Sequence, residues 1–145
     1  MSSPGTYIVV LKSGQAKTIQ IGKLAQMDIR KGYYAYVGSA LGPGGVEARL
    51  KHHRKVSAKP HWHLDYLRAE TEFYQAYALY SPDRKECEWA VVLDGSEAVS
   101  ESMKGFGSSD CRCSSHLFYF ASHKNMVRAI HLIEVVQRIN LDVSI

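Results

Sequence analysis

Two short segments that each place a tyrosine near a glycine constrain the fold of this chain most. Thr6–Leu11 is an apolar run rich in β-branched residues, and Gly32–Gly38, with the sequence GYYAYVG, is rich in aromatic residues. Apolar runs of this length and composition are typical of buried strands. Side chains alternate between the faces of a strand, so pairing of the two segments would allow Tyr7 and Tyr36 to meet on one face.

Helical and extended patterns alternate along the rest of the chain. Further strands are expected over Thr18–Ile21, Phe73–Tyr80 and Leu117–Phe120. Helices are expected over Val46–Lys55, from Lys59 to about Ala69, from Ser81 as N-cap to Gly95, and over Asn125–Ile139. A chain of 145 residues fits one domain. The predicted class is therefore α+β, with a small mixed, mainly antiparallel central sheet flanked by helices, in a single domain over residues 1–145.

Composition limits the cellular compartment and the kind of binding partner that suit this chain. The longest apolar runs, Tyr7–Leu11 and Leu117–Ala121, are far short of the ~20 residues that a membrane span requires. The N-terminal residues lack the basic and apolar regions of a secretory signal, and three cysteines fit a reducing, cytoplasmic setting. The net charge is +4, and eleven residues without a carboxylate hold five cations: Arg49, Lys51, Arg54, Lys55 and Lys59. A basic face of this kind suits a polyanion such as nucleic acid.

Candidate catalytic residues follow the two tyrosines in order. Arg49 and His53 lie four residues apart, so a helix would present both on one face. The later segment ECEWA offers Glu88 as a carboxylate, with Glu86 as the alternative. An arginine fork matches phosphate oxygens, and a carboxylate is a hard ligand suited to Mg²⁺. Neutral tyrosine is a poor base and needs a nearby cation, metal or histidine to act near pH 7.

The order of these motifs resembles that of the GIY-YIG nuclease superfamily. The segments that carry the resemblance are GTY, GYYAYVGSALG, ARLKHHRK, HWHLDYL, ECEWA and GFGSSDCRCSSHLF, between Gly5 and about Phe120. Within the superfamily the chain looks like a branch, a family of unknown function, whose members occur alone or fused to endonuclease III-type DNA glycosylases. The resemblance implies a divalent-metal-dependent endonuclease that hydrolyses DNA in repair or processing. RNA stays open as a substrate, a repair glycosylase is a candidate partner, and the oligomeric state is left open.

The resemblance also implies a role for each site residue. Tyr7 and Tyr36 would be the active-site tyrosines, one of which helps to activate the attacking water. Arg49 would bind the scissile phosphate, and His53 would assist proton transfer or orient a tyrosine. Glu88 would hold one Mg²⁺ or Mn²⁺ ion.

Residues around this set are expected to contact DNA. The expected contacts are Gly38, Ser39, Lys51, Arg54 and Lys55.

The sequence also departs from the superfamily pattern. The segment Thr18–Ile21 lengthens the interval between the tyrosines, and Thr6 stands where the superfamily name has isoleucine. A late asparagine of the superfamily has no clear counterpart, since Asn125 and Asn140 both lie in or near the last predicted helix. The alternative is therefore a nucleic-acid-binding module with the same fold that cleaves weakly or not at all.

Two other groups suggest metal sites. His61 and Asp65 would share a helix face, with His63 nearby, but the favoured interpretation is that Trp62 and Tyr66 pack inward while the histidine and aspartate side chains form hydrogen bonds. Asp65 is then expected to orient a neighbouring arginine or histidine. A second set would suit structural Zn²⁺: Cys87, Cys111, Cys113 and His116. Its C-x-C spacing is less usual than C-x-x-C, and buried cysteines often serve as small apolar residues. Zinc is thus the minor alternative for this set.

Overall fold

The computed structural model describes residues 3–96, 101–102, 106, 115–133 and 137–139. In chain order, the elements in these ranges are β1 (Gly5–Ser13), β2 (Lys17–Ile21), β3 (Ala25–Ile29), β4 (Gly32–Ala40), α1 (Gly45–Arg54), α2 (His63–Arg68), β5 (Glu72–Tyr80), α3 (Glu86–Asp94), β6 (Glu101–Ser102), β7 (Leu117–Phe120), α4 (His123–Ile130) and β8 (Gln137–Ile139).

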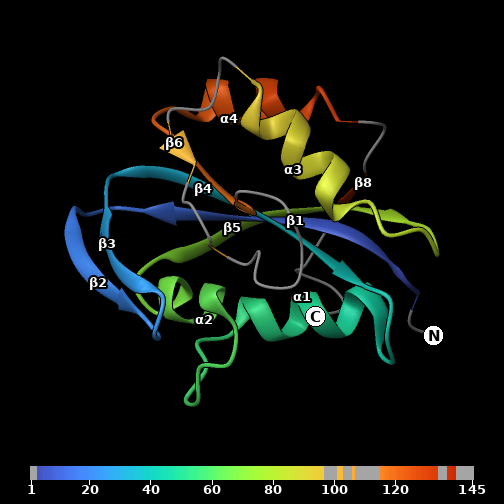
Figure 1. The fold of residues 1–145 in the computed structure, drawn as a ribbon, viewed down its shortest axis with the longest axis horizontal. Coiled ribbons are helices and arrows are strands. Elements are labelled where there is room, and N and C mark those ends of the chain that lie inside the picture. Colours follow the sequence, from blue (N-terminus) through green and yellow to red (C-terminus); the bar gives the residue numbers. More distant parts are fainter. Residues whose placement is uncertain (1–2, 97–100, 103–105, 107–114, 134–136, 140–145) are drawn as a thin grey trace.

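A six-stranded sheet forms the middle layer. Its strand order is β6-β7-β4-β1-β5-β8, while β2 and β3 form a separate hairpin, and every pairing between the described strands is antiparallel. Helices α1 and α2 and the β2–β3 hairpin lie on one face, and α3 and α4 lie on the other (Figure 1). This arrangement confirms the predicted α+β class, with an antiparallel sheet flanked by helices.

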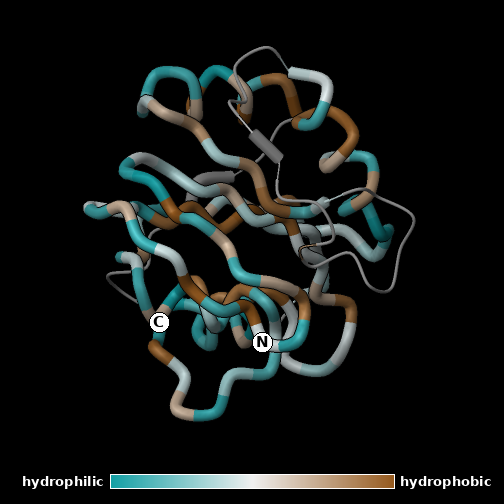
Figure 2. The backbone as a smooth tube through the Cα atoms, turned by 60° about the vertical axis from the view of Figure 1, so that its left-hand side comes forward, coloured by the Kyte–Doolittle hydropathy of each residue, from teal (hydrophilic) through white to brown (hydrophobic). Residues whose placement is uncertain are grey.

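Two hydrophobic clusters, one on each face of the sheet, hold the layers together. Tyr7, Val9 and Leu11 of β1 join the cluster under α1, α2 and the hairpin, whereas Ile8 and Val10 join the cluster under α3 and α4. Strand β1 is buried almost throughout because both of its faces are covered. Figure 2 shows hydrophobic stretches along the central strands and the helices, and hydrophilic residues at many of the bends between them.

The predicted starts of two helices are wrong. Helix α3 begins at Glu86, because the Ser81 hydroxyl accepts the N–H of Asp83 in a local turn instead of capping a helix. Helix α2 begins at His63, since Asp65 accepts the N–H groups of the residues before it and so fixes the helix start there.

The last predicted helix also differs. Helix α4 begins after Ser122, whose hydroxyl accepts the N–H of Asn125, and ends at Ile130. Residues Gln137–Ile139 instead form strand β8, which pairs with β5 at the edge of the sheet. A helical pattern cannot reveal such a pairing, because it depends on a neighbour far away in the sequence. None of the helices in the described ranges has the length and hydrophobicity needed to cross a membrane.

Candidate active site

The two tyrosines project from the central strands toward α1. In the register of β1 and β4, Tyr7 lies opposite Gly38 and Tyr36 lies opposite Val9. Both tyrosines are buried, and the ring centroid of His53 lies 5.6 Å from that of Tyr7 and 5.9 Å from that of Tyr36. The structure therefore brings together three of the residues singled out in the sequence.

Gly38 leaves the space that the Tyr7 side chain occupies. A β-carbon on Gly38 would lie 2.5 Å from the hydroxyl oxygen of Tyr7 and 2.6 Å from the ring carbon that carries it. Only a residue without a side chain fits here, so Gly38 serves the placement of Tyr7 across the strand pair. The sequence pattern places Gly38 among the DNA-contacting residues, and the structure gives it this internal role.

Substitution Gly38→Ala is expected to destabilise the fold and to displace Tyr7. The added methyl group meets a buried ring on a central strand, and overpacking of this kind costs about 1–3 kcal/mol. Urea unfolding would measure the loss. Gly14→Ala is the matched control, because a β-carbon there meets nothing within 4 Å. Equal unfolding midpoints for the two variants would contradict this account of Gly38.

Helix α1 carries the cationic side of the site. It starts at a turn in which Gly44 and Gly45 have φ values of 88° and 61°, a conformation that glycine adopts without strain. Val46, Leu50 and His53 are buried along one side of the helix, which fixes its rotation against the sheet. Arg49, one turn before His53, is thereby directed to the same region.

A buried hydrogen bond joins Tyr7 to His53. The Tyr7 hydroxyl lies 2.8 Å from Nε2 of His53. Burial lowers the pKa of His53 to about 3, so the imidazole is neutral at pH 7. Burial and the neighbouring Tyr36 raise the pKa of Tyr7, and the Arg49 guanidinium acts in the opposite direction. Tyr7 is therefore a protonated phenol in this state.

Arg49 is held in place by an aromatic ring. Its guanidinium carbon lies 4.7 Å from the ring centroid of Trp62, and the group also hydrogen-bonds Tyr7. A pocket of about 160 Å³ opens beside it, lined by the Gly42–Gly45 loop and by Arg49, His52 and Trp62. A planar cation stacked on a ring beside an open pocket is well placed to bind an anionic group.

The carboxylate near the tyrosines is Glu86. Its Oε1 accepts a 2.8 Å hydrogen bond from the Ser39 hydroxyl, and its charge raises the pKa of Tyr7. Oε2 lies 3.6 Å from Nδ1 of His116, and Oε1 lies 3.4 Å from Nε of Arg84. Ser39, expected among the DNA contacts, is engaged by this carboxylate.

Glu88, the favoured metal ligand in the sequence, is exposed on α3. Two residues of helix turn its side chain about 200° from that of Glu86. Glu86 shares its stripe with the buried Trp89, Ala90 and Leu93, whereas Glu88 shares its own with the exposed Val91 and Val92. All five residues from Trp89 to Leu93 are apolar, so the sequence carries no periodicity that could have distinguished the two carboxylates.

The family model of a domain of unknown function, DUF123, matches residues 6–139. The chain belongs to the DUF123 family. The match includes every described residue of the site, from Tyr7 to His116. No curated protein and no solved structure matches this DUF123 domain.

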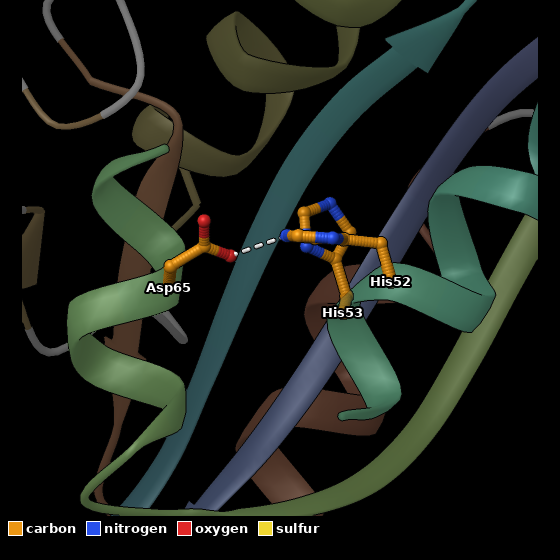
Figure 3. A group of neighbouring side chains, drawn as sticks. All are labelled: His52, His53 and Asp65. Atoms are coloured by element: carbon orange, nitrogen blue, oxygen red, sulfur yellow. Dashed lines mark hydrogen bonds and ion pairs between the residues drawn. The ribbon is translucent and has the colours of Figure 1, made fainter. Parts of the chain in front are cut away.

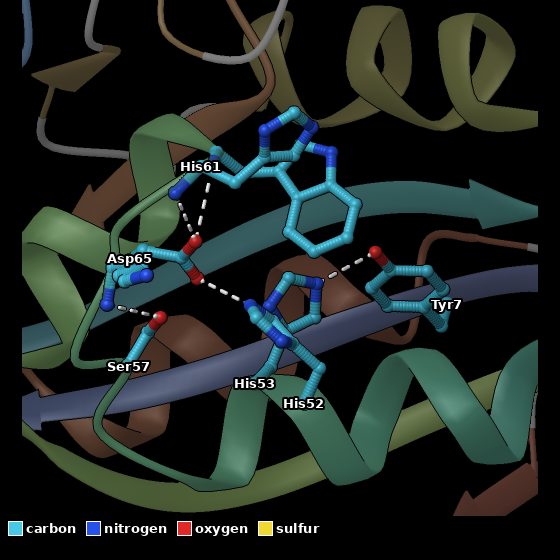
Figure 4. A network of polar contacts seen from close by, with 8 residues as sticks. Tyr7, His52, His53, Ser57, His61 and Asp65 are labelled. Atoms are coloured by element: carbon cyan, nitrogen blue, oxygen red, sulfur yellow. Dashed lines mark hydrogen bonds and ion pairs between the residues drawn. The ribbon is translucent and has the colours of Figure 1, made fainter.

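A second polar network extends the site of the DUF123 domain away from the tyrosines. Oδ1 of the buried Asp65 lies 2.8 Å from Nε2 of His52 (Figure 3), and Oδ2 accepts the N–H groups of His61 and Trp62 (Figure 4). Burial alone would raise the pKa of Asp65, but these N–H groups and His52 bring the pKa below its ordinary value. The expectation that Asp65 orients a neighbouring histidine is confirmed.

The histidine that Asp65 orients is His52, which the sequence pattern did not single out. The rings of His61 and His63, the candidates beside Asp65 in the sequence, pack on Trp62 and Phe106 respectively. Because His52 and Asp65 lie on different helices, their spacing along the chain carries no signal of their contact.

The remaining candidates lie on or next to α1, on α3 and just before β7. Lys51 and Lys55 are exposed, and Arg54 is half-buried on α1. Of the candidate zinc set, Cys87 is half-buried on α3 and His116 faces Glu86. Cys111 and Cys113 lie outside the described residues.

Proposed function

We propose that this DUF123 domain is a divalent-metal-dependent endonuclease of GIY-YIG type, which hydrolyses phosphodiester bonds in DNA during repair or processing. The observation that carries the proposal is the approach of Arg49 and the buried His53 to Tyr7, together with the carboxylate of Glu86, whose charge acts on the same phenol. These residues come from the central sheet and from two helices, and together they offer a phenol, a phosphate-binding cation and a carboxylate.

Glu86 is the residue that would hold the metal ion. Mg²⁺ and Mn²⁺ prefer hard oxygen ligands, and Mg²⁺ is commonly bound by only one or two carboxylates together with waters and substrate phosphates. A half-buried carboxylate beside the Ser39 hydroxyl fits that donor chemistry. When bound, the ion would stabilise charge on the phosphate and lower the pKa of a bound water.

The side chains of the chain would share the remaining work. Arg49 would bind the oxygens of the scissile phosphate and stabilise the negative charge that develops there. The Tyr7 hydroxyl would orient the attacking water, with Tyr36 beside it. His53 holds a proton poorly because its pKa is about 3, so its proposed role is to position Tyr7. Exposed Lys51 and Lys55 would contact flanking phosphates, and a DNA repair glycosylase is the partner class that we propose.

A specific observation favours a second candidate, a DNA-binding module without cleavage. Asn125 lies in the first turn of α4, close to His123, which packs on Tyr33 at the start of β4. Tyr7 and Glu86 lie at the other end of that strand, beside Gly38 and Ser39, so Asn125 does not supply the late asparagine of the superfamily. A site with weak catalysis would keep the basic helix α1 and bind DNA in a salt-dependent manner.

Cleavage of labelled DNA and RNA structures in Mg²⁺, Mn²⁺ or EDTA tests the proposal. We expect metal-dependent DNA cleavage that falls at least ~10²-fold in Glu86→Gln, since a lost charge-stabilising group costs about that much. Glu88→Gln is the matched control on the same helix and should cleave normally. Salt-sensitive binding without cleavage under any condition would favour the second candidate. Cleavage that survives Glu86→Gln would remove Glu86 from the mechanism.

A further inference from the structure

His52, His53 and Asp65 gather three ligand atoms in a small volume. One nitrogen of each histidine and one oxygen of the aspartate lie within 4.8 Å of one another (Figure 3). The two histidines are adjacent on α1, and Asp65 reaches them from α2. The ring centroids of His52 and His53 are 5.5 Å apart, and Trp62 packs against both rings. The group therefore belongs to a packed junction of two helices.

One atom of this group has no partner in the part of the chain that the structure describes. Nδ1 of His53 is inaccessible to solvent and makes no hydrogen bond there, while Nε2 of the same ring is bound to Tyr7. Leaving a buried polar atom unsatisfied costs about 1–3 kcal/mol. A ligand that accepts the lone pair of this nitrogen would remove the cost.

Asp65 is oriented as carboxylate ligands of metals usually are. Its Oδ2 is fixed by the N–H groups of His61 at 2.8 Å and Trp62 at 3.0 Å, which leaves Oδ1 directed toward His52. Outer hydrogen bonds of this kind hold metal-binding carboxylates in place. The bond from Oδ1 to His52 would give way to two bonds to a shared ion.

We propose that His52, His53 and Asp65 form a binding site for a transition-metal ion of the Zn²⁺ or Co²⁺ class, distinct from the Mg²⁺ site assigned to Glu86. Two imidazoles and one carboxylate are a donor set that Zn²⁺ and Co²⁺ accept, whereas Mg²⁺ prefers oxygen ligands alone. Three protein ligands leave a coordination position open. His52 also lines the pocket beside Arg49, so a water or an anion could occupy that position.

Metal binding at Nδ1 would set the direction of the Tyr7 hydrogen bond. With its lone pair at Nδ1 engaged, the neutral ring carries its proton on Nε2 and donates it to the Tyr7 oxygen. Tyr7 could then no longer donate its proton to His53. Only this consequence for catalysis rests on the proposed function; the binding site itself does not.

Co²⁺ and Zn²⁺ titrations of the full chain, stripped with EDTA, test the site. We expect one ion per chain by calorimetry, visible absorption bands for bound Co²⁺, and no displacement by millimolar Mg²⁺. His52→Gln should weaken binding at least ~100-fold, since loss of a metal ligand exceeds the 10–100-fold cost of losing an outer partner. Circular dichroism and thermal unfolding would verify that the variant is folded.

Two controls make the result specific. His61→Gln removes an exposed imidazole next to the group and should leave affinity unchanged, as should Glu86→Gln in the other candidate metal site. No binding of Co²⁺ or Zn²⁺ by the folded wild-type chain would overturn the proposal. So would equal loss in His61→Gln, which would indicate a surface histidine site. Mg²⁺-dependent cleavage is measured in a separate assay, so failure of this metal site and failure of the nuclease activity are distinguishable.

Discussion

Substitution Arg49→Ala is expected to slow phosphodiester cleavage by about 10³-fold, which corresponds to roughly 4 kcal/mol of transition-state stabilisation. The guanidinium is stacked on Trp62 and hydrogen-bonded to Tyr7, so it is oriented before substrate arrives. A preoriented cation loses little energy to reorganisation as charge develops on the phosphate. Its removal should therefore lower kcat more than it raises KM.

Two comparison variants separate charge from geometry. Arg49→Lys keeps the charge but loses the planar fork and much of the stacking, so we expect a loss of roughly 10–100-fold. Lys51→Ala removes an exposed cation two residues further along α1 and should raise KM and reduce the salt dependence of binding by about one phosphate contact. A kcat in Arg49→Ala equal to that of the wild type would show that Arg49 only binds DNA.

Acidification is expected to destabilise the fold through His53. The pKa of this histidine is about 3 in the folded chain because of burial, and about 6.5 in the unfolded chain. Below pH 6.5 the unfolded chain therefore binds a proton that the folded chain does not bind. Stability is at its full value above pH 6.5 and declines progressively as the pH falls toward 3. At pH 5 the loss from this residue is about 2 kcal/mol.

Urea unfolding at pH 7 and pH 5, with EDTA present, measures this linkage. Burial also lowers the pKa of His63 and His116, so the wild-type loss should exceed the share of His53. His53→Gln should be less stable at pH 7 but should lose about 2 kcal/mol less than the wild type on acidification. His123→Gln replaces an exposed histidine and should keep the full pH dependence. Identical pH dependence in wild type and His53→Gln would exclude a buried neutral His53.

The sequence predicted best the parts of the fold that local patterns determine. Strands β1, β4, β5 and β7 have apolar or aromatic runs between turn residues, and each lies where the pattern indicated. The expectation that Tyr7 and Tyr36 meet was conditional on the pairing of these two strands, and the structure has that pairing, with His53 close to both tyrosines. Strand β8 was missed because its partner β5 lies about sixty residues earlier, beyond the reach of a helical or extended pattern.

The candidate site shows the same limit at the level of side chains. Arg49 and His53 are related by one turn of one helix, so their common direction was predictable. The choice between Glu86 and Glu88 depended on the rotation of α3, which its buried Trp89 fixes against the sheet. The contact of His52 with Asp65 depends on how two helices cross, and no spacing in the chain encodes that.

The site draws its groups from both sides of the sheet, and this has a consequence for partly unfolded states. Arg49 and His53 lie on α1, on one face of the sheet, whereas Glu86 lies on α3, on the opposite face. A local opening that detached only α3 would preserve most of the secondary structure, yet it would separate the carboxylate from the arginine. Such a species would look nearly native by circular dichroism and would have lost its candidate catalytic centre. The activity of this centre would therefore indicate whether the two helical layers are both packed against the sheet.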